Sequence, residues 1–103
     1  MCVPAISTFV PTADDVKRIV AYTFRLRISD FASPSRRSHV AWARHVAVYL
    51  VRETLELSFP RTAICFRRHH STMISSCNRV LARMAKEPQF AAMVERLKRE
   101  CRT

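Results

Sequence analysis

Apolar residues recur at helical spacing along most of this chain, and capping signals divide the pattern into separate helices. Thr12-Ala13-Asp14-Asp15 resembles a capping box with aspartate in place of glutamate. Apolar residues follow at i, i+3, i+4 and i+8 from Val16, which is one stripe of an amphipathic helix. Residues 1–11 contain two prolines and no clear period. We therefore predict an N-terminal tail over 1–11 and one folded domain over 12–103.

A turn and a loop follow the first helix. Ser29 can cap a short turn over residues 30–32, and the polar segment Ser33-Pro34-Ser35-Arg36-Arg37 then predicts a loop stiffened by proline. Ser38 can cap the next helix, which we expect to run to about Leu55. The helical period assigns Val40, Ala43, Ala47, Leu50, Val51 and Thr54 to its buried face and leaves Arg44, His45 and Arg52 off that face.

Two helices of unequal length are predicted next. Ser58-Phe59-Pro60 is a strong start signal, because a serine cap precedes a proline in the first turn. The apolar pattern stops after Phe66 and resumes from about His70 to Lys86. A short capped helix, a tight turn and a longer helix form the outline of a helix-turn-helix. The predicted buried residues are Phe59, Ala63 and Phe66 in the short helix, and Met73, Ile74, Cys77, Val80, Leu81 and Met84 in the long one.

A last helix begins at Glu87-Pro88 and carries apolar residues at helical spacing from Phe90 to Cys101. Five helices, one short turn and no strand predict an all-α fold, a small helical bundle that contains a helix-turn-helix. The chain contains no glycine, which excludes a P-loop and a glycine-rich dinucleotide turn. We therefore expect no nucleotide and no cofactor.

The charge of the chain is concentrated in its middle. The net charge is +10, and the pI is near 10.8. Residues 31–86 hold ten basic residues and only two acidic ones, Glu53 and Glu56. A solvated surface normally intersperses both signs, so this segment predicts a polyanionic partner, most often nucleic acid.

The chemistry at the predicted turn strengthens this interpretation. Six consecutive residues there can each donate a hydrogen bond, and the N-terminus of a helix attracts phosphate through its free N–H groups and its dipole. In helix-turn-helix proteins the first residues of the second helix touch base edges. The six residues are Arg67, Arg68, His69, His70, Ser71 and Thr72.

The run Arg68-His69-His70-Ser71-Thr72-Met73 is similar to a family signature, Arg-Asp-His-Thr-Thr-Val. Asp15-Val16 with Val20, Ser29-Asp30-Phe31, Arg36-Arg37, Ala41 with Arg44, and Ser58 with Pro60 match the same family in register. From about Ala13 to Val80, the chain resembles the C-terminal DNA-binding domain, domain IV, of the bacterial replication initiator DnaA. The resemblance implies a Trp-repressor-like helix-turn-helix bundle that binds double-stranded DNA.

The resemblance also implies roles for individual residues. Arg36 matches a loop arginine that enters the minor groove, and His70 and Ser71 match a His-Thr pair that contacts bases in the major groove. Arg68 and Thr72 match flanking positions that hold the backbone, and Arg44 and His45 match positions that contact phosphate. The predicted DNA-binding residues are Arg36, Arg37, Arg44, His45, Arg61, Arg67, Arg68, His69, His70, Ser71 and Thr72.

The sequence departs from the family at the turn. His69 stands where the family has aspartate, so an acceptor becomes a potential donor and we expect a good helix cap to be lost. The turn has no glycine and is one residue shorter after Phe66, and Ser38 replaces a second loop arginine. These changes bear on preference for the DnaA-box sequence more than on DNA binding. No ATPase domain accompanies the match, so we expect a stand-alone relative that does not assemble with ATP.

Two functions remain open. The first is a regulator that occupies DnaA-box-like sites in control of replication initiation or of transcription, which the charge of residues 31–86 favours. The second is a modulator that kept the fold but binds the initiator or its regulators, which His69 and the shortened turn favour. Met1–Ala13 has no basic signal-peptide region, and no apolar run approaches the ~20 residues that span a membrane. We expect a cytoplasmic, nucleoid-associated protein with reduced thiols and no membrane partner.

Metal and catalytic chemistry fit the sequence poorly. Cys65, His69, His70 and Cys77 have no spacing of a common zinc finger, so we expect no metal. Cysteine–histidine catalysis would need an orienting acid, and residues 57–86 contain none. We therefore expect no catalytic residues and no enzyme activity.

Overall fold

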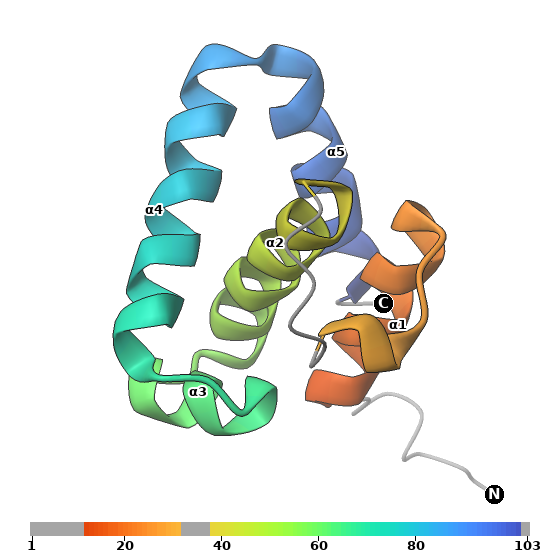
Figure 1. Cartoon of the computed structure of the whole chain (residues 1–103). Coiled ribbons are helices and arrows are strands. Elements are labelled where there is room, and N and C mark those ends of the chain that lie inside the picture. The colour runs from red at the N-terminus through yellow and green to blue at the C-terminus, as the bar shows by residue number, and fades with distance from the viewer. Residues whose placement is uncertain (1–11, 32–37, 102–103) are drawn as a thin grey trace, which may run out of the picture.

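The computed structural model describes residues 12–31 and 38–101, and within them every regular element is helical (Figure 1). The fold class predicted from the sequence, an all-α bundle with a helix-turn-helix, is confirmed. In chain order the elements are α1 (Ala13–Phe24), the 3-10 turn η2 (Ile28–Phe31), α2 (Ser38–Leu55), α3 (Phe59–Phe66), α4 (His70–Lys86) and α5 (Pro88–Cys101).

The ends of these helices follow from local capping. The Thr12 hydroxyl accepts from the backbone N–H of Asp15, and the Asp15 carboxylate accepts from that of Thr12, which completes the predicted capping box. The hydrogen bond from the Thr12 backbone N–H to the Asp15 carboxylate, followed by an interaction with the Thr12 side chain, is the main cause of a lowered pKa at Asp15. At the start of α3 the Ser58 hydroxyl accepts from the N–H of Arg61, and Pro60 occupies the first turn, also as predicted.

The turn after α1 differs in detail from its prediction. It begins at Ile28 rather than after Ser29, and the Asp30 carboxylate accepts from the backbone N–H of Arg27 at 2.9 Å. Carboxylate oxygens are stronger acceptors than a hydroxyl, so Asp30 organises this turn. Helix α2 includes Ser38 as its first residue.

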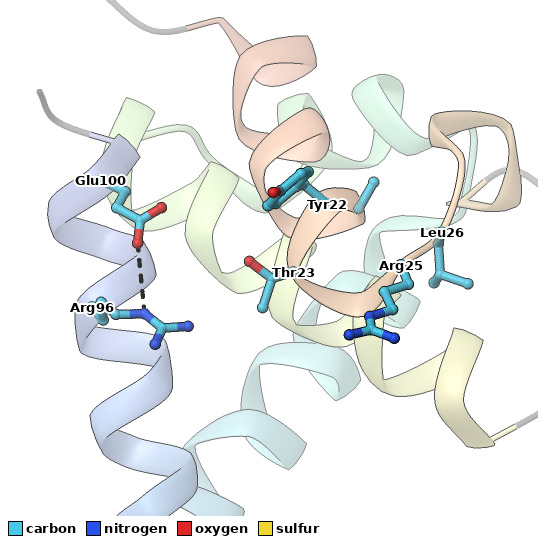
Figure 2. A pocket seen from close by; sticks show the side chains of 7 residues that line it. Tyr22, Thr23, Arg25, Leu26, Arg96 and Glu100 are labelled. Carbon is cyan, nitrogen blue, oxygen red and sulfur yellow. Dashed lines mark ion pairs between the residues drawn. The ribbon is translucent and has the colours of Figure 1, made fainter.

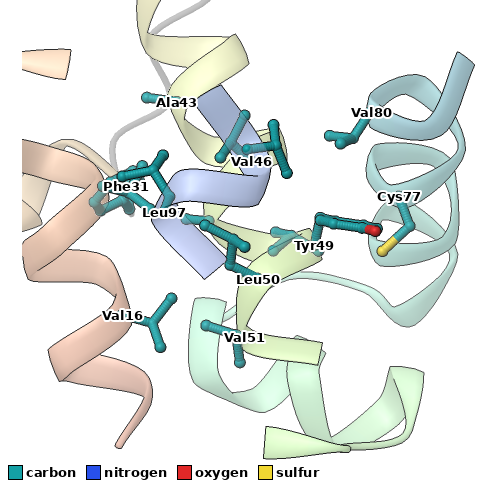
Figure 3. Packing of buried hydrophobic residues seen from close by; sticks show 14 of the residues in the cluster. Val16, Phe31, Ala43, Val46, Tyr49, Leu50, Val51, Cys77, Val80 and Leu97 are labelled. Atoms are coloured by element: carbon teal, nitrogen blue, oxygen red, sulfur yellow. The ribbon is translucent and has the colours of Figure 1, made fainter. Parts of the chain in front are cut away.

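Helix α2 is the centre of the bundle. It lies between α1 on one side and α4 on the other, and Figure 3 shows Val16 of α1, Leu97 of α5 and Val80 of α4 converging on it. A helix that contacts neighbours on several sides is buried beyond one stripe. The predicted single face is therefore incomplete, and Thr54 at its end is only half-buried. The further buried apolar residues of α2 are Val46, Val48 and Tyr49.

Two predicted core positions on α4 are wrong. Ile74 is 37% exposed and Leu81 is 51% exposed, so both lie at the edge of the buried stripe. The stripe itself consists of Met73, Ser76, Cys77 and Val80. Helix α4 rests on α2 and α3 along this line and also contacts α5.

Candidate nucleic-acid interface

The turn between α3 and α4 is held by backbone hydrogen bonds rather than by glycine. Arg67 takes the left-handed conformation, with φ of 54°, and its N–H reaches back to the carbonyls of Ala63 and Ile64. The N–H of Arg68 donates to the Ala63 carbonyl at 3.1 Å. These bonds close the end of α3 in the manner of a Schellman motif. The left-handed conformation costs a non-glycine residue about 1–2 kcal/mol.

His69 begins the second helix of the motif. Its Nδ1 accepts from the backbone N–H of Ser71 at 3.2 Å and lies 2.8 Å from the Ser71 hydroxyl. The prediction that this position lacks a good cap is therefore wrong, because an imidazole nitrogen replaces the expected side-chain oxygen. The His69 ring also stacks on that of His70, with centroids 4.5 Å apart and planes at 28°.

An exposed polar surface covers α4 from its first turn. His70, Ser71 and Thr72 are exposed at the N-terminus, as a major-groove contact requires. The same face continues with Ser75, Asn78 and Arg79, which are also exposed and were not among the predicted site residues. The signal that could have found them is the helical period itself, since they follow Ser71 and Thr72 at i+3, i+4 and i+7.

His45 supports α4 from beneath. Its Nδ1 is 2.9 Å from the Ser76 hydroxyl on the buried side of α4, and its ring meets the edge of Trp42. Burial, followed by the charges of Arg79 and Arg44, lowers the pKa of His45 to about 4. The half-buried ring is therefore neutral at pH 7 and positions α4; its contact with phosphate stays a prediction.

Arg44 lies on the buried side of α2, so the prediction that it lies off the buried face is wrong. It is 9% exposed, and its Nε donates to the Phe31 carbonyl at 3.1 Å. This bond ties η2 to α2, although 13 residues separate the two partners. Burial, with a smaller contribution from the charge of Arg68, lowers the pKa of Arg44. A phosphate role for Arg44 stays a prediction.

The other predicted arginines surround the turn. Arg61 and Arg67 are exposed, and Arg68 is half-buried close to Arg44. Arg67, Arg68, His69 and His70 line a hollow between α3 and the start of α4, together with the exposed Ile64. Arg36 and Arg37, the predicted loop arginines, lie outside the described residues. The structure thus brings the α3–α4 residues together and describes nothing of the loop pair.

The described residues offer no group of three or more histidine, cysteine or acidic side chains arranged to hold a metal ion. Burial raises the pKa of the Cys77 and Cys101 thiols to about 11, so both are protonated at neutral pH. No helix within 12–31 or 38–101 combines the length and apolarity needed to cross a membrane.

A second hollow lies away from the helix-turn-helix, between the end of α1 and α5 (Figure 2). Tyr22 is 87% exposed beside it, and Arg25 contributes to its lining. Arg96 and Glu100 of α5 form an ion pair there, with Nε and Oε2 3.5 Å apart. This hollow has mixed charge, in contrast to the basic surface at the α3–α4 turn.

Two comparisons relate the chain to known proteins. A family model described as the bacterial DnaA protein helix-turn-helix matches residues 13–80. A solved structure of a DNA replication initiation factor superimposes with a TM-score of 0.75 at 26% sequence identity. The match covers 86% of this chain and 28% of that factor, so the chain spans less than a third of its length.

Proposed function

Since the chain belongs to the DNA-binding family of the bacterial DnaA helix-turn-helix, we propose that it binds double-stranded DNA with a preference for DnaA-box-like sites. The proposal rests above all on one observation. Exposed donors gather at the N-terminus of α4, and the sequence from 57 to 86 contains no acidic residue that would repel a phosphate or pair with these basic groups.

In this proposal the α4 N-terminus enters the major groove. His70 and Ser71 contact bases, and Ile74, whose edge is exposed, can meet a thymine methyl group. Arg61, Arg67 and Thr72 contact the backbone around them. Arg68 completes these contacts from its half-buried position. By the resemblance, Arg36 adds a minor-groove contact beside Arg37, and the site serves control of replication initiation or of transcription.

Buried residues hold this surface in place. The His45–Ser76 hydrogen bond fixes the rotation of α4 over α2, and Arg44 fixes η2 against α2. Arg44 and His45 then act by positioning the surface, and any phosphate contact they make adds to that.

The experiment is a binding titration of the whole chain with two labelled duplexes of equal length and composition. One contains a DnaA-box sequence and the other the same bases in shuffled order. We expect affinity for the box duplex to be at least tenfold higher at physiological salt. Equal affinity for both would leave DNA binding without the proposed preference.

A second candidate function is that of a protein-binding modulator of the initiator or its regulators. The observation that favours it is Tyr22, an almost fully exposed aromatic side chain beside the α1–α5 hollow. Aromatic residues of this kind are enriched at the centres of protein interfaces. Titration with purified initiator tests it: Tyr22→Ser should abolish binding, and undetectable binding of the unmodified chain would refute it.

A further inference from the structure

The hydrogen bonds at the start of α4 determine which ring nitrogen of His69 carries the proton. Its Nδ1 contacts both the backbone N–H and the hydroxyl of Ser71, at 3.2 and 2.8 Å. A backbone N–H can only donate, so Nδ1 has no proton and accepts. A neutral imidazole has one N–H, which must then be at Nε2. The Ser71 hydroxyl likewise gives its proton to Nδ1 and keeps its oxygen lone pairs for other partners.

Two neighbouring exposed groups therefore have fixed and opposite polarity. His69 offers a donor through Nε2–H, while Ser71 offers an acceptor through Oγ. Rotation of the His69 ring by 180° would replace Nδ1 with a carbon and break the cap. The stack on His70 further restricts the ring, since the two planes are only 28° apart.

We propose that His69 is a specificity-determining residue that reads a hydrogen-bond acceptor on a base edge in the major groove. This inference rests on the proposed binding of duplex DNA. Guanine presents two acceptors there, N7 and O6, whereas cytosine presents only the N4 amino donor. His69 therefore favours guanine over cytosine, with adenine N7 and thymine O4 as single acceptors between the two, and Ser71 favours the amino group of a neighbouring adenine or cytosine. An aspartate at position 69 would have the reverse preference.

Two substitutions of His69 separate its role as the cap of α4 from its contact with a base edge. Asparagine and aspartate both cap helices well through one side-chain oxygen. With that oxygen used in the cap, His69→Asn directs an amide donor outward, and His69→Asp directs a carboxylate acceptor outward. The pair keeps the start of α4 and reverses the polarity offered to DNA; H69D also adds one negative charge, which weakens binding to every sequence alike and leaves base preference as the measure.

The test determines the preferred base at each position for the unmodified chain, H69N and H69D, by selection from a randomised duplex pool. We expect the unmodified chain and H69N to favour guanine at one position. H69D should favour cytosine at that position, and the guanine-to-cytosine affinity ratio should change by roughly five- to a hundredfold. Replacement of that guanine by 7-deazaguanine should weaken the unmodified chain and leave H69D unaffected, if N7 is the contact.

Three results would overturn the inference alone. Identical base preferences for H69D and the unmodified chain would show that position 69 does not read a base. A proton on Nδ1 of His69, detected by the ¹⁵N chemical shifts of the free protein, would contradict the assignment of the donor to Nε2. Binding by all three proteins with no base preference would refute the reading while leaving DNA binding intact. Failure of all three to bind any duplex would instead refute the proposed function, and the inference with it.

Discussion

The two sides of the bundle use arginine differently. On the α1 and α5 side, Arg18 pairs with Asp15 and Arg96 with Glu100, so these charges are compensated within the protein. Residues 57–86 contain no acid, and the ion pair of Arg83 there uses Glu87 beyond that segment. The high net charge alone therefore does not define the interface. What defines it is where the positive charge has no acidic neighbour in sequence and lies beside an exposed helix N-terminus.

Loss of a core side chain that joins the two sides should change stability the most. Phe66 is 2% exposed at the end of α3, and the ammonium of Lys17 on α1 lies 4.7 Å from the centre of its ring. Phe66→Ala should lower the free energy of unfolding by about 3–5 kcal/mol, measured by urea denaturation. Ile64→Ala, on the same helix but 76% exposed, should change it by less than about 0.5 kcal/mol. Equal losses would mean that α3 does not present Ile64 to solvent.

The next effect tests the difference between the two sets of arginines. R61Q/R67Q and R18Q/R96Q each remove two positive charges, so their effect on net charge is identical. We expect R61Q/R67Q to weaken duplex binding by roughly 30- to 100-fold, because contacts with phosphate are lost. R18Q/R96Q should weaken it only a few-fold through the overall field. Fluorescence anisotropy measures both, and similar losses would contradict the assignment of the interface.

A smaller effect is expected on the pH dependence of folding stability. Because the pKa of His45 falls from 6.5 to about 4 on folding, the unfolded chain binds more protons between these values. Stability should therefore be intact above pH 6.5 and should fall as the pH drops towards 4. After allowance for partial exposure of the ring, the loss is about 1–2 kcal/mol. His45→Gln should remove this part of the pH dependence in thermal denaturation. An unchanged pH dependence would contradict the buried, neutral state of His45.

The smallest effect is expected from relieving backbone strain at two arginines, only one of which is proposed to contact DNA. Arg67 and Arg25 both end a helix with left-handed backbone, at φ of 54° and 57°. Glycine is unstrained there, so Arg67→Gly and Arg25→Gly should each stabilise the fold by about 0.5–1 kcal/mol. Only Arg67→Gly should also weaken DNA binding, because Arg25 lies on the other side of the bundle. A loss of binding in both variants would remove that distinction.

Much of the fold was predictable because its signals are local. The Thr12 capping box and the Ser58-Pro60 start each depend on side chains within three residues of the groups they cap, so the sequence alone reveals them. The start of α4 at His70 was also predicted, since the apolar period resumes there. The helix-turn-helix outline follows from these boundaries.

The failed predictions depend on partners distant in sequence or on unusual chemistry. Arg44 is buried because its acceptor is the Phe31 carbonyl, which no helical period reveals. Ile74 matches the apolar pattern but lies at the edge of the buried stripe, beside the fully buried Met73. His69 caps α4 through a nitrogen, whereas sequence rules expect an oxygen at that position. The helix-turn-helix that carries the candidate site was therefore predictable from the sequence, whereas the polarity of the groups at its turn comes from the structure.

The salt dependence of duplex binding shows directly whether this surface binds the DNA backbone. If about five to seven basic residues around the α3–α4 turn and the Arg36-Arg37 segment neutralise phosphates, log K should fall linearly with log salt concentration with a slope of about −5 to −6. The R61Q/R67Q protein should give a slope smaller in magnitude by about 2. A slope near zero for the unmodified chain would contradict the claim that this surface binds the DNA backbone.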